Sequence, residues 1–143
     1  MAAKQTNLAV TPESIREMIV GRFPGDLGVE PLEVTDSRTV ARLLVDARHL
    51  HEGDYVQGGA WVGLADSVAA WQTARHVPPG TAFSTIELKL NLFAAARSGD
   101  ELIATAEHLH DGRTTHVVEV RIVRGERLIA NLVVTQFISP PAK

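Results

Sequence analysis

Apolar and polar residues alternate strictly from Thr85 to Leu92, and this is the clearest pattern in the chain. Such alternation is typical of a strand that buries one face and leaves the other polar. The pattern predicts a strand over residues 82–93. Its buried face would carry Ile86, Leu88, Leu90 and Leu92, and its polar face Thr85, Glu87, Lys89 and Asn91.

Further strands are predicted on both sides of this one. Residues 101–110, 114–124 and 127–138 are rich in aliphatic and β-branched residues and are separated by glycine-containing turn signals. We expect these three strands and the strand at 82–93 to form an antiparallel meander. Nearer the N-terminus, residues 27–35 and 39–46 predict a hairpin around the turn-like pair Asp36-Ser37.

Two helices are predicted. Thr11 is an N-cap candidate followed by Pro12 at the first helical position, which predicts a short helix that ends near Gly21. Residues 58–76 predict the one long helix, and Pro78-Pro79-Gly80 stops it.

The long helix determines the expected fold class. Between Asp54 and Arg75 its only charged residue is Asp66, and a helix that is apolar all round must be buried all round. We therefore expect an α+β fold in which a curved antiparallel sheet wraps around this helix. Small residues would allow close approach of strands or of a second copy of the helix, which suggests a dimer: Gly58, Gly59, Gly63, Ala65, Ala69 and Ala70.

Composition narrows the function classes. The 143 residues suit one domain, with residues 1–26 as an N-terminal helix and lead-in and 139–143 as a tail. There is no cysteine, which excludes thiol chemistry and cysteine-based zinc sites. A net charge of −3 without a basic patch argues against nucleic acid as a partner. Residues 55–74 are the most apolar stretch of the chain, but polar residues and glycines interrupt them too often for a membrane span. Residues 1–11 lack a secretory signal, so we expect a cytoplasmic protein.

Asp66 is the first candidate for chemistry. It lies about eight residues into the helix, well beyond the first turn, so neither capping nor the helix dipole explains it. Apolar neighbours on the same face are a frequent setting for a general base. The alternative is that Asp66 faces a solvent gap or bonds a buried backbone group.

A second candidate lies at the start of the same helix. Gln57-Gly58-Gly59 is the junction of loop and helix, where free backbone N–H groups could polarise a carbonyl as an oxyanion hole does. A glycine pair that eases a tight chain entry is the alternative. Gly58 and Asp66 are eight residues apart, or about 12 Å along one helix. If both act on one reacting group, they must come from two chains related by a two-fold axis.

Three segments of the chain resemble a known family: Gln57-Gly58-Gly59-Ala60, Leu64-Ala65-Asp66-Ser67, and the strand from Thr85 to Phe93. Together they are similar to hotdog-fold acyl-CoA thioesterases of the phenylacetyl-CoA and 4-hydroxybenzoyl-CoA type. Gly99-Asp100 and Gly112-Arg113 match later signals of that family.

The resemblance implies roles for particular residues. Gly58 would donate the N–H that polarises the thioester carbonyl, and Asp66 of the facing subunit would act as base or nucleophile. Thr85, with Ser84 beside it, would help to hold the attacking water. Gly59, Ser67 and Ser84 are further expected substrate contacts. The implied assembly is a homodimer, or a dimer of dimers, that binds an acyl-CoA and needs no cofactor.

The chain also departs from the family's pattern. Gln57 replaces the usual histidine before the glycines and cannot carry a proton in the physiological range. His51, near a position where members have asparagine, is either a water-orienting or polarising residue or a solvent-facing loop histidine. Ala94-Ala95 replaces Arg-Pro, which leaves Arg97 and Arg113 as candidates for contacts to CoA phosphates.

The histidine pairs 49/51 and 108/110 each lie on one face of a strand, but the sequence specifies no third ligand, so we predict no metal. Two rival functions stay open. One is a hotdog enoyl-CoA hydratase or dehydratase that uses His51, and the other is an acyl-CoA binding protein without turnover.

Overall fold

A computed structural model describes residues 6–140. Its helices are α1 (Pro12–Met18), α2 (Phe23–Leu27) and α3 (Gly58–Arg75), with a short 3₁₀ helix, η1 (Ala47–His49). Its strands are β1 (Glu30–Val34), β2 (Thr39–Leu44), β3 (Phe83–Leu92), β4 (Glu101–Asp111), β5 (Thr115–Arg124) and β6 (Arg127–Ile138). The predicted elements are therefore confirmed to within a few residues, whereas α2 and η1 were not predicted.

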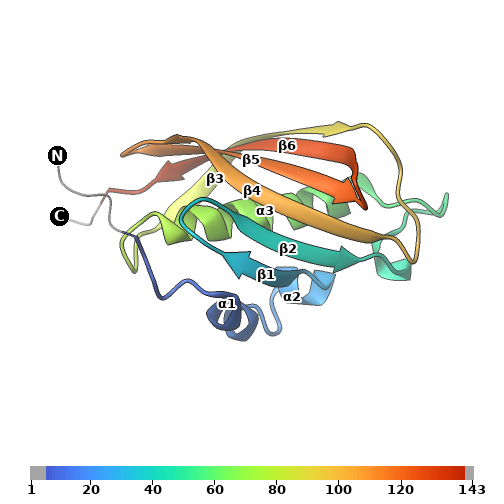
Figure 1. The fold of residues 1–143 in the computed structure, drawn as a ribbon, viewed down its shortest axis with the longest axis horizontal. Coiled ribbons are helices and arrows are strands. Elements are labelled where there is room, and N and C mark those ends of the chain that lie inside the picture. Colours follow the sequence, from blue (N-terminus) through green and yellow to red (C-terminus); the bar gives the residue numbers. More distant parts are fainter. Residues whose placement is uncertain (1–5, 141–143) are drawn as a thin grey trace.

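Within residues 6–140 the strands form one six-stranded antiparallel sheet in the order β1-β2-β4-β5-β6-β3 (Figure 1). The hairpin of β1 and β2 and the meander of β4, β5 and β6 are confirmed. The prediction that β3 pairs with β4 is wrong, because β3 pairs with β6 at the sheet edge and β4 pairs with β2. Turn signals mark where a strand ends, but they do not determine which edge the next strand joins.

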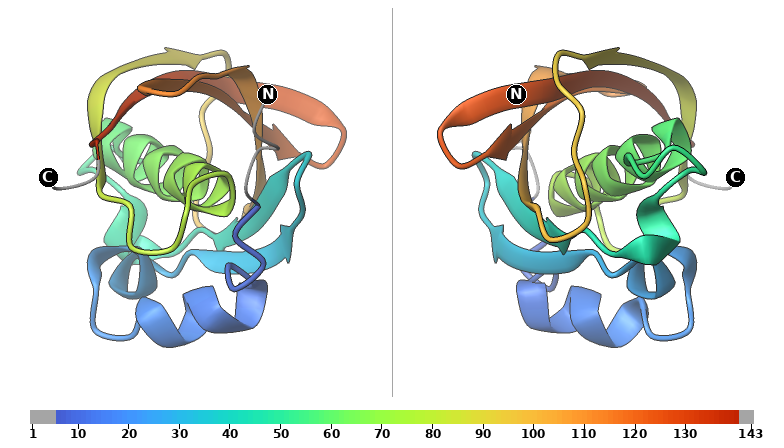
Figure 2. Two further views of the ribbon diagram at one scale, coloured as in Figure 1. Left: turned by 90° about the vertical axis from the view of Figure 1, so that its left-hand side faces the viewer. Right: turned by 90° about the vertical axis from the view of Figure 1, so that its right-hand side faces the viewer.

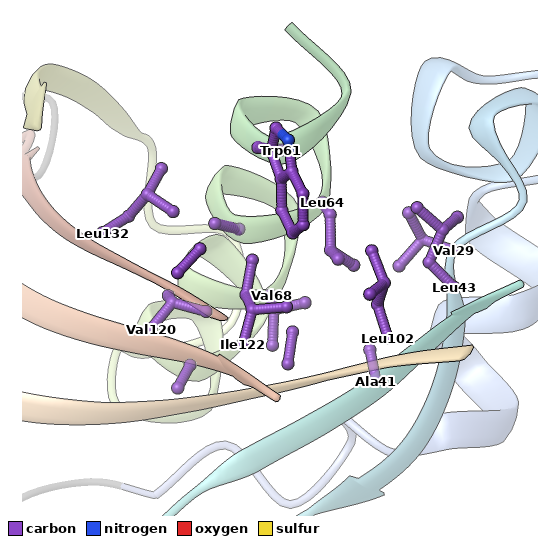
Figure 3. Close-up of a cluster of buried hydrophobic side chains, with 14 of the residues drawn as sticks. Val29, Ala41, Leu43, Trp61, Leu64, Val68, Leu102, Val120, Ile122 and Leu132 are labelled. Atoms are coloured by element: carbon purple, nitrogen blue, oxygen red, sulfur yellow. The ribbon is translucent and has the colours of Figure 1, made fainter. Parts of the chain in front are cut away.

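The sheet curves over α3, as the resemblance to the hotdog fold implied (Figure 2). Leu64 and Val68 of α3 are fully buried and point toward sheet residues such as Val120 and Ile122, which are also fully buried (Figure 3). Trp61 and Trp71 belong to the same core. Since apolar burial contributes about 25 cal/mol per Å², this contact is the main source of stability for the fold.

The expectation that α3 is buried all round is wrong in one respect. Along this helix, all of which the structure describes, Val62, Asp66 and Ala70 are only half-buried, and Gly58 and Gly59 are exposed. Residues spaced by four lie on one face of a helix, so Val62, Asp66 and Ala70 form a stripe that the sheet of one chain leaves open. We call this the open stripe of α3.

The predicted two faces of β3 are also partly wrong. A register shift between Thr85 and Glu87 in the pairing with β6 marks a β-bulge, which reverses the alternation at Ile86. Ile86 is 61% exposed and Leu92 is 47% exposed, whereas Leu88 and Leu90 pack against the core. The bulge turns Thr85, which was assigned to the polar face, toward α3.

Helix α2 packs on α3, whereas α1 packs against β1 (Figure 2). A Cβ added to Gly63 would lie 2.8 Å from Leu27 and 2.9 Å from Phe23, so the absence of a side chain lets α2 approach α3 closely. Gly63 thus accommodates α2 of the same chain, which is a different use from the predicted contact with strands or with a second helix.

We expect Leu64→Ala to lower the free energy of unfolding by about 2–5 kcal/mol, because it leaves a cavity where α3 meets the sheet. Leu44 is 55% exposed on β2, so Leu44→Ala is a matched control with a much smaller expected effect. Urea denaturation of both variants measures the difference, and equal losses of stability would contradict this account of the core.

Candidate functional site

A short chain of hydrogen bonds connects α3 to the edge of the sheet. The Thr85 hydroxyl donates to Asp66 Oδ1 at 2.7 Å, and Gln136 Nε2 donates to Thr85 Oγ1 at 3.3 Å. Gln136 is 1% exposed and lies opposite Thr85 in the β3–β6 pairing. The three side chains therefore hold one carboxylate oxygen in a defined position.

The second oxygen of Asp66 is available for chemistry. Within residues 6–140, Asp66 Oδ2 has no hydrogen-bond partner and no cation lies within ion-pair distance. Asp66 belongs to the half-buried open stripe, so this oxygen can receive a proton from a water molecule or attack an electrophile. Neither capping nor a buried backbone partner accounts for Asp66.

Gln136 was not predicted to be a residue of the site. Leu132, Val134 and Gln136 are buried and occupy alternate positions of β6, so an uncharged polar residue continues an inward-facing series. This pattern was visible in the sequence as a polar break in a buried strand face. Its link to Asp66 was not visible, because that link depends on the pairing of β3 with β6.

The start of α3 is open. Gln57 is the N-cap residue and its side chain makes no capping bond. The Ala60 N–H donates to Gln57 O at 2.9 Å, while the N–H groups of Gly58 and Gly59 have no acceptor within residues 6–140. Apart from the adjacent residues and the backbone of the helix itself, no atom of the described chain lies within 4 Å of a Cβ built on either glycine. These two N–H groups and the positive end of the helix dipole thus face open space.

Asp66 and Gly58 do not converge within one chain. They are eight residues apart on a single straight element, which separates them by about 12 Å. Within one chain the free N–H groups and the carboxylate are therefore too far apart to contact one small reacting group.

His51 lies in the loop that precedes α3. Its Nδ1 accepts the Gly53 N–H at 2.8 Å, so the other ring nitrogen bears the proton when the ring is neutral. The His51 N–H donates to Tyr55 O at 2.9 Å, which closes the loop into a tight turn. His51 thus belongs to the same loop as Gln57 and Gly58 and has no hydrogen bond to Asp66.

His49 has a structural role. Its side chain is fully buried, Nδ1 accepts the Asp46 N–H at 2.9 Å, and Nε2 donates to Leu27 O at 2.6 Å. This histidine joins η1 to the end of α2, and its backbone O accepts the Gln57 N–H at 2.8 Å. It therefore helps to position the loop that leads to Gly58.

Two predicted substrate contacts are not brought to the carboxylate. Ser67 is buried and its hydroxyl donates to Gly63 O of the preceding turn at 2.6 Å. Ser84 is exposed and, as the neighbour of Thr85 in a strand, points to the opposite face of β3. Gly59 lies beside Gly58 at the exposed helix start.

The two arginine candidates lie in different places. Arg97 Nη2 donates to the Tyr55 hydroxyl, and its guanidinium lies 4.6 Å from the centroid of that ring. Within residues 6–140 it forms no ion pair with a carboxylate. Arg113, by contrast, lines a surface pocket of about 750 Å³ with residues 78–82 and 138–140, beyond the other end of α3.

Asp100 holds the backbone of Arg97 and forms no ion pair with its guanidinium. The backbone N–H of Arg97 donates to Asp100 Oδ2 at 2.9 Å, and Arg124 Nη1 donates to the same oxygen at 3.0 Å. These bonds, with the backbone bond contributing most, hold the pKa of Asp100 below its usual range. The Arg97 side chain remains an exposed cation next to the loop at the start of α3.

Helices long and apolar enough to cross a membrane are absent from residues 6–140.

Known proteins resemble this chain in sequence. The model of the thioesterase superfamily matches residues 53–130, a segment that contains Gly58, Asp66 and Thr85. The 1,4-dihydroxy-2-naphthoyl-CoA hydrolase of Listeria monocytogenes serotype 1/2a (strain 10403S) is 30% identical over 96 residues, which are 67% of this chain and 77% of that protein.

Solved structures share the fold. A thioesterase from Haemophilus influenzae has a TM-score of 0.87 at 21% identity and covers 100% of this chain and 98% of its own. The PaaI protein of E. coli, from the phenylacetic acid degradation operon, has a TM-score of 0.79 at 22% identity and covers 90% of this chain and 92% of its own. With its hotdog fold and a family match over more than half of its length, the chain belongs to the thioesterase superfamily, which supports hydrolysis of thioesters.

Proposed function

We propose that this protein hydrolyses an acyl-CoA thioester in a site shared by two chains. Gly58 of one chain would polarise the carbonyl, and Asp66 of the other would drive the attack. The observation that carries the proposal is the state of Asp66: one oxygen is held by Thr85, the other is free, and the residue lies on the open stripe of α3.

The two half-sites supply complementary chemistry. The Gly58 N–H, at the positive end of α3, suits the negative charge that develops on the thioester oxygen. Asp66 would then take a proton from water as the water oxygen bonds to the carbonyl carbon. As the tetrahedral intermediate collapses, the C–S bond breaks and the proton passes to the departing thiolate. Alternatively, Asp66 Oδ2 attacks the carbonyl carbon and the C–S bond breaks with departure of the thiolate. Water then hydrolyses the resulting anhydride, which restores the Asp66 carboxylate and supplies the proton that the thiolate takes up.

Thr85 and Gln136 act as positioning residues in this scheme. By donating to Oδ1, the Thr85 hydroxyl leaves Oδ2 as the oxygen that reacts. Gln136 donates to Thr85 Oγ1 and so directs the Thr85 proton toward the carboxylate. Asp66 would keep one orientation although it stands on a partly exposed face.

Two features support a dimer. β3 is an edge strand of the described sheet, so one side of its backbone is unpaired, and Ile86 on this strand is 61% exposed. The open stripe of α3 lies next to this edge strand, because Asp66 in the stripe is hydrogen-bonded to Thr85 of β3. A second chain that joined the edge would cover the stripe. A two-fold axis through this region would bring the N-terminus of each α3 toward the Asp66 of the other. Pairs of such dimers would give the expected dimer of dimers.

Arg97 is the candidate for the CoA phosphates. It belongs to the same end of the molecule as Gly58, because the Val56 N–H next to the helix start donates to Ala96 O at 2.9 Å.

Since the Listeria relative is named as a hydrolase of an aromatic acyl-CoA, aromatic and aliphatic acyl-CoAs both belong in a thiol-release screen.

Asp66→Asn keeps the size and polarity of the side chain but removes the base or nucleophile. We expect kcat for thiol release to fall by about 10²–10⁴-fold with the circular dichroism spectrum unchanged. Asp54→Asn in the exposed loop before α3 is the matched control and should keep wild-type activity. Full activity in a folded Asp66→Asn protein would exclude Asp66 as the catalytic group.

Thr85→Val removes the hydroxyl from a strand position without changing its shape. A hydrogen bond to a charged group contributes about 1.5–3 kcal/mol, so we expect kcat to fall by about 10–100-fold with little change in KM. Thr85→Ser retains the hydroxyl and should restore most of kcat. If Val and Ser behaved alike, the hydroxyl would have no part in positioning Asp66.

Mixed dimers test the shared site directly. Gly58→Pro removes the N–H at the first helical position, where proline is tolerated, and should lower kcat by about 10²–10³-fold. Gly58→Ala keeps the N–H and, with open space around it, serves as the control.

Neither the Asp66→Asn nor the Gly58→Pro protein should be active alone. After the two are unfolded and refolded together in equal amounts, half of the dimers are heterodimers with one intact site, so about a quarter of wild-type activity should return. If the mixture stayed inactive although heterodimers had formed, the two groups would not come from different chains.

A further inference from the structure

Four ionisable side chains meet near the C-terminal end of α3, away from Gly58. His76 follows the last residue of the helix, His108 and Asp111 come from the end of β4, and His116 from the start of β5. We call these four residues the His–Asp cluster. The proposed hydrolysis uses none of them.

The hydrogen bonds of His76 determine which ring nitrogen bears its proton. Nε2 lies 2.6 Å from the backbone O of Asp36 and 3.1 Å from Gln72 Nε2, and the shorter of these contacts, to a carbonyl oxygen, requires a hydrogen on Nε2. The amide of Gln72 is oriented by Thr39, which donates to Gln72 Oε1 at 2.6 Å, and Gln72 Nε2 donates to the same Asp36 oxygen at 3.3 Å. Asp36 O is thus held as an acceptor for the His76 ring.

With its proton on Nε2, a neutral His76 directs the Nδ1 lone pair at a carboxylate. Nδ1 lies 2.8 Å from Asp111 Oδ2. Two lone pairs at this distance repel each other unless a positive charge, either a proton or a metal ion, lies on Nδ1 or between the two atoms. A ligating histidine that donates its other N–H to a backbone carbonyl is the usual arrangement at metal centres.

The other two histidines of the cluster lie close to Asp111 and to each other. His108 Nε2 and His116 Nδ1 lie 2.9 Å apart, and His116 Nε2 lies 3.2 Å from Asp111 Oδ1. The rings of His76 and His108 are 4.4 Å apart at their centroids. One ligand atom each from His76, His108 and Asp111 lies within 4.8 Å of the others.

We propose that the His–Asp cluster binds a divalent transition-metal ion of the zinc type. His76 Nδ1, a ring nitrogen of His108 and an oxygen of Asp111 would be its ligands, and His116 would donate to the second oxygen of Asp111 or supply a fourth ligand. Ligand atoms bound about 2.0–2.1 Å from a zinc ion lie closer together than 4.8 Å, so binding requires a modest convergence of the side chains. Imidazole nitrogen favours zinc, copper or nickel over magnesium and calcium.

The degree of burial fits such a site. The His76 and Asp111 side chains are 16% and 15% exposed, and His116 is 2% exposed. An ion could therefore enter from solvent and then be largely shielded from it. His76 is ten residues from Asp66, or about 15 Å along the axis of α3. The ion would link the end of the central helix to β4 and β5, and it would have no direct part in thioester chemistry.

The structure also explains why the sequence predicted no metal. The pair considered there was His108 and His110, for which no third ligand was specified. A register shift between His108 and His110 in the β4–β5 pairing disrupts that pair. The fold instead brings His76 and Asp111 to His108.

Metal binding can be tested on the untagged full-length chain after treatment with EDTA and dialysis. Titration with Co²⁺ should produce visible absorption bands of a low-symmetry site that saturate at one ion per chain, and Zn²⁺ should displace them. Zn²⁺ in excess should raise Tm, because an ion that binds only the folded state stabilises it.

Asp111→Asn and His108→Gln should each weaken Co²⁺ binding by at least about tenfold and abolish the rise in Tm. His110→Gln, at an exposed position two residues from His108, is the matched control and should bind like wild type. Absence of saturable binding by the wild-type chain would overturn the proposal and assign the charge at His76 to a proton. Equal binding by Asp111→Asn and His110→Gln would overturn it as well, and this readout is independent of hydrolysis.

Discussion

The hydrogen bond from Thr85 to Asp66 is the interaction on which the organisation of the candidate site depends. A carboxylate on an apolar helix is costly to bury unless it is hydrogen-bonded. The β-bulge of β3 provides the partner, because it turns the Thr85 hydroxyl toward α3. The same bulge directs Ile86 outward on an edge strand. One local irregularity therefore both positions the carboxylate and shapes the edge at which a second chain would join.

Helix α3 both forms the core of the fold and carries the polar groups of the candidate site. Most of its surface packs into the curved sheet or against α2, and this burial stabilises the fold. Val62, Asp66 and Ala70 stay half-buried, and the glycines at its start stay exposed. A single chain could not bring both the N–H groups and the carboxylate to one thioester, because the two are about 12 Å apart along the helix. In the proposed dimer, the length of this helix would make activity depend on assembly.

The two ends of α3 have distinct surroundings. At its start, η1 and His49 hold the loop that presents Gly58, and Arg97 adds a positive charge nearby. At its other end, His76 Nδ1 lies 2.8 Å from the Asp111 carboxylate, with His108 and His116 beside them. An ion bound there would join the C-terminal end of α3 to β4 and β5. It would lie away from the proposed hydrolytic site.

Much of the architecture could be predicted from local patterns. Period-two alternation and turn residues indicated all six strands of the described region, and the apolar helix with its single carboxylate indicated both the wrapped fold and Asp66. The spacing of Gly58 and Asp66 already implied two chains. The strands, the long helix and the wrapped fold are confirmed because each depends on the geometry of one element or on burial, which the sequence encodes directly, whereas the two-chain site stays a prediction.

Other features were decided only by the tertiary structure. The pairing of β3 with β6, the bulge at Ile86 and the alignment of Gln136 with Thr85 depend on how distant strands meet. The open stripe of α3 depends on where the sheet stops, and the His–Asp cluster on residues from 36 to 116 that no local pattern relates. The amino-acid sequence specifies which reactive groups the protein possesses. Long-range pairing brings some of these groups together, because contact between distant residues is a property of the whole packed chain.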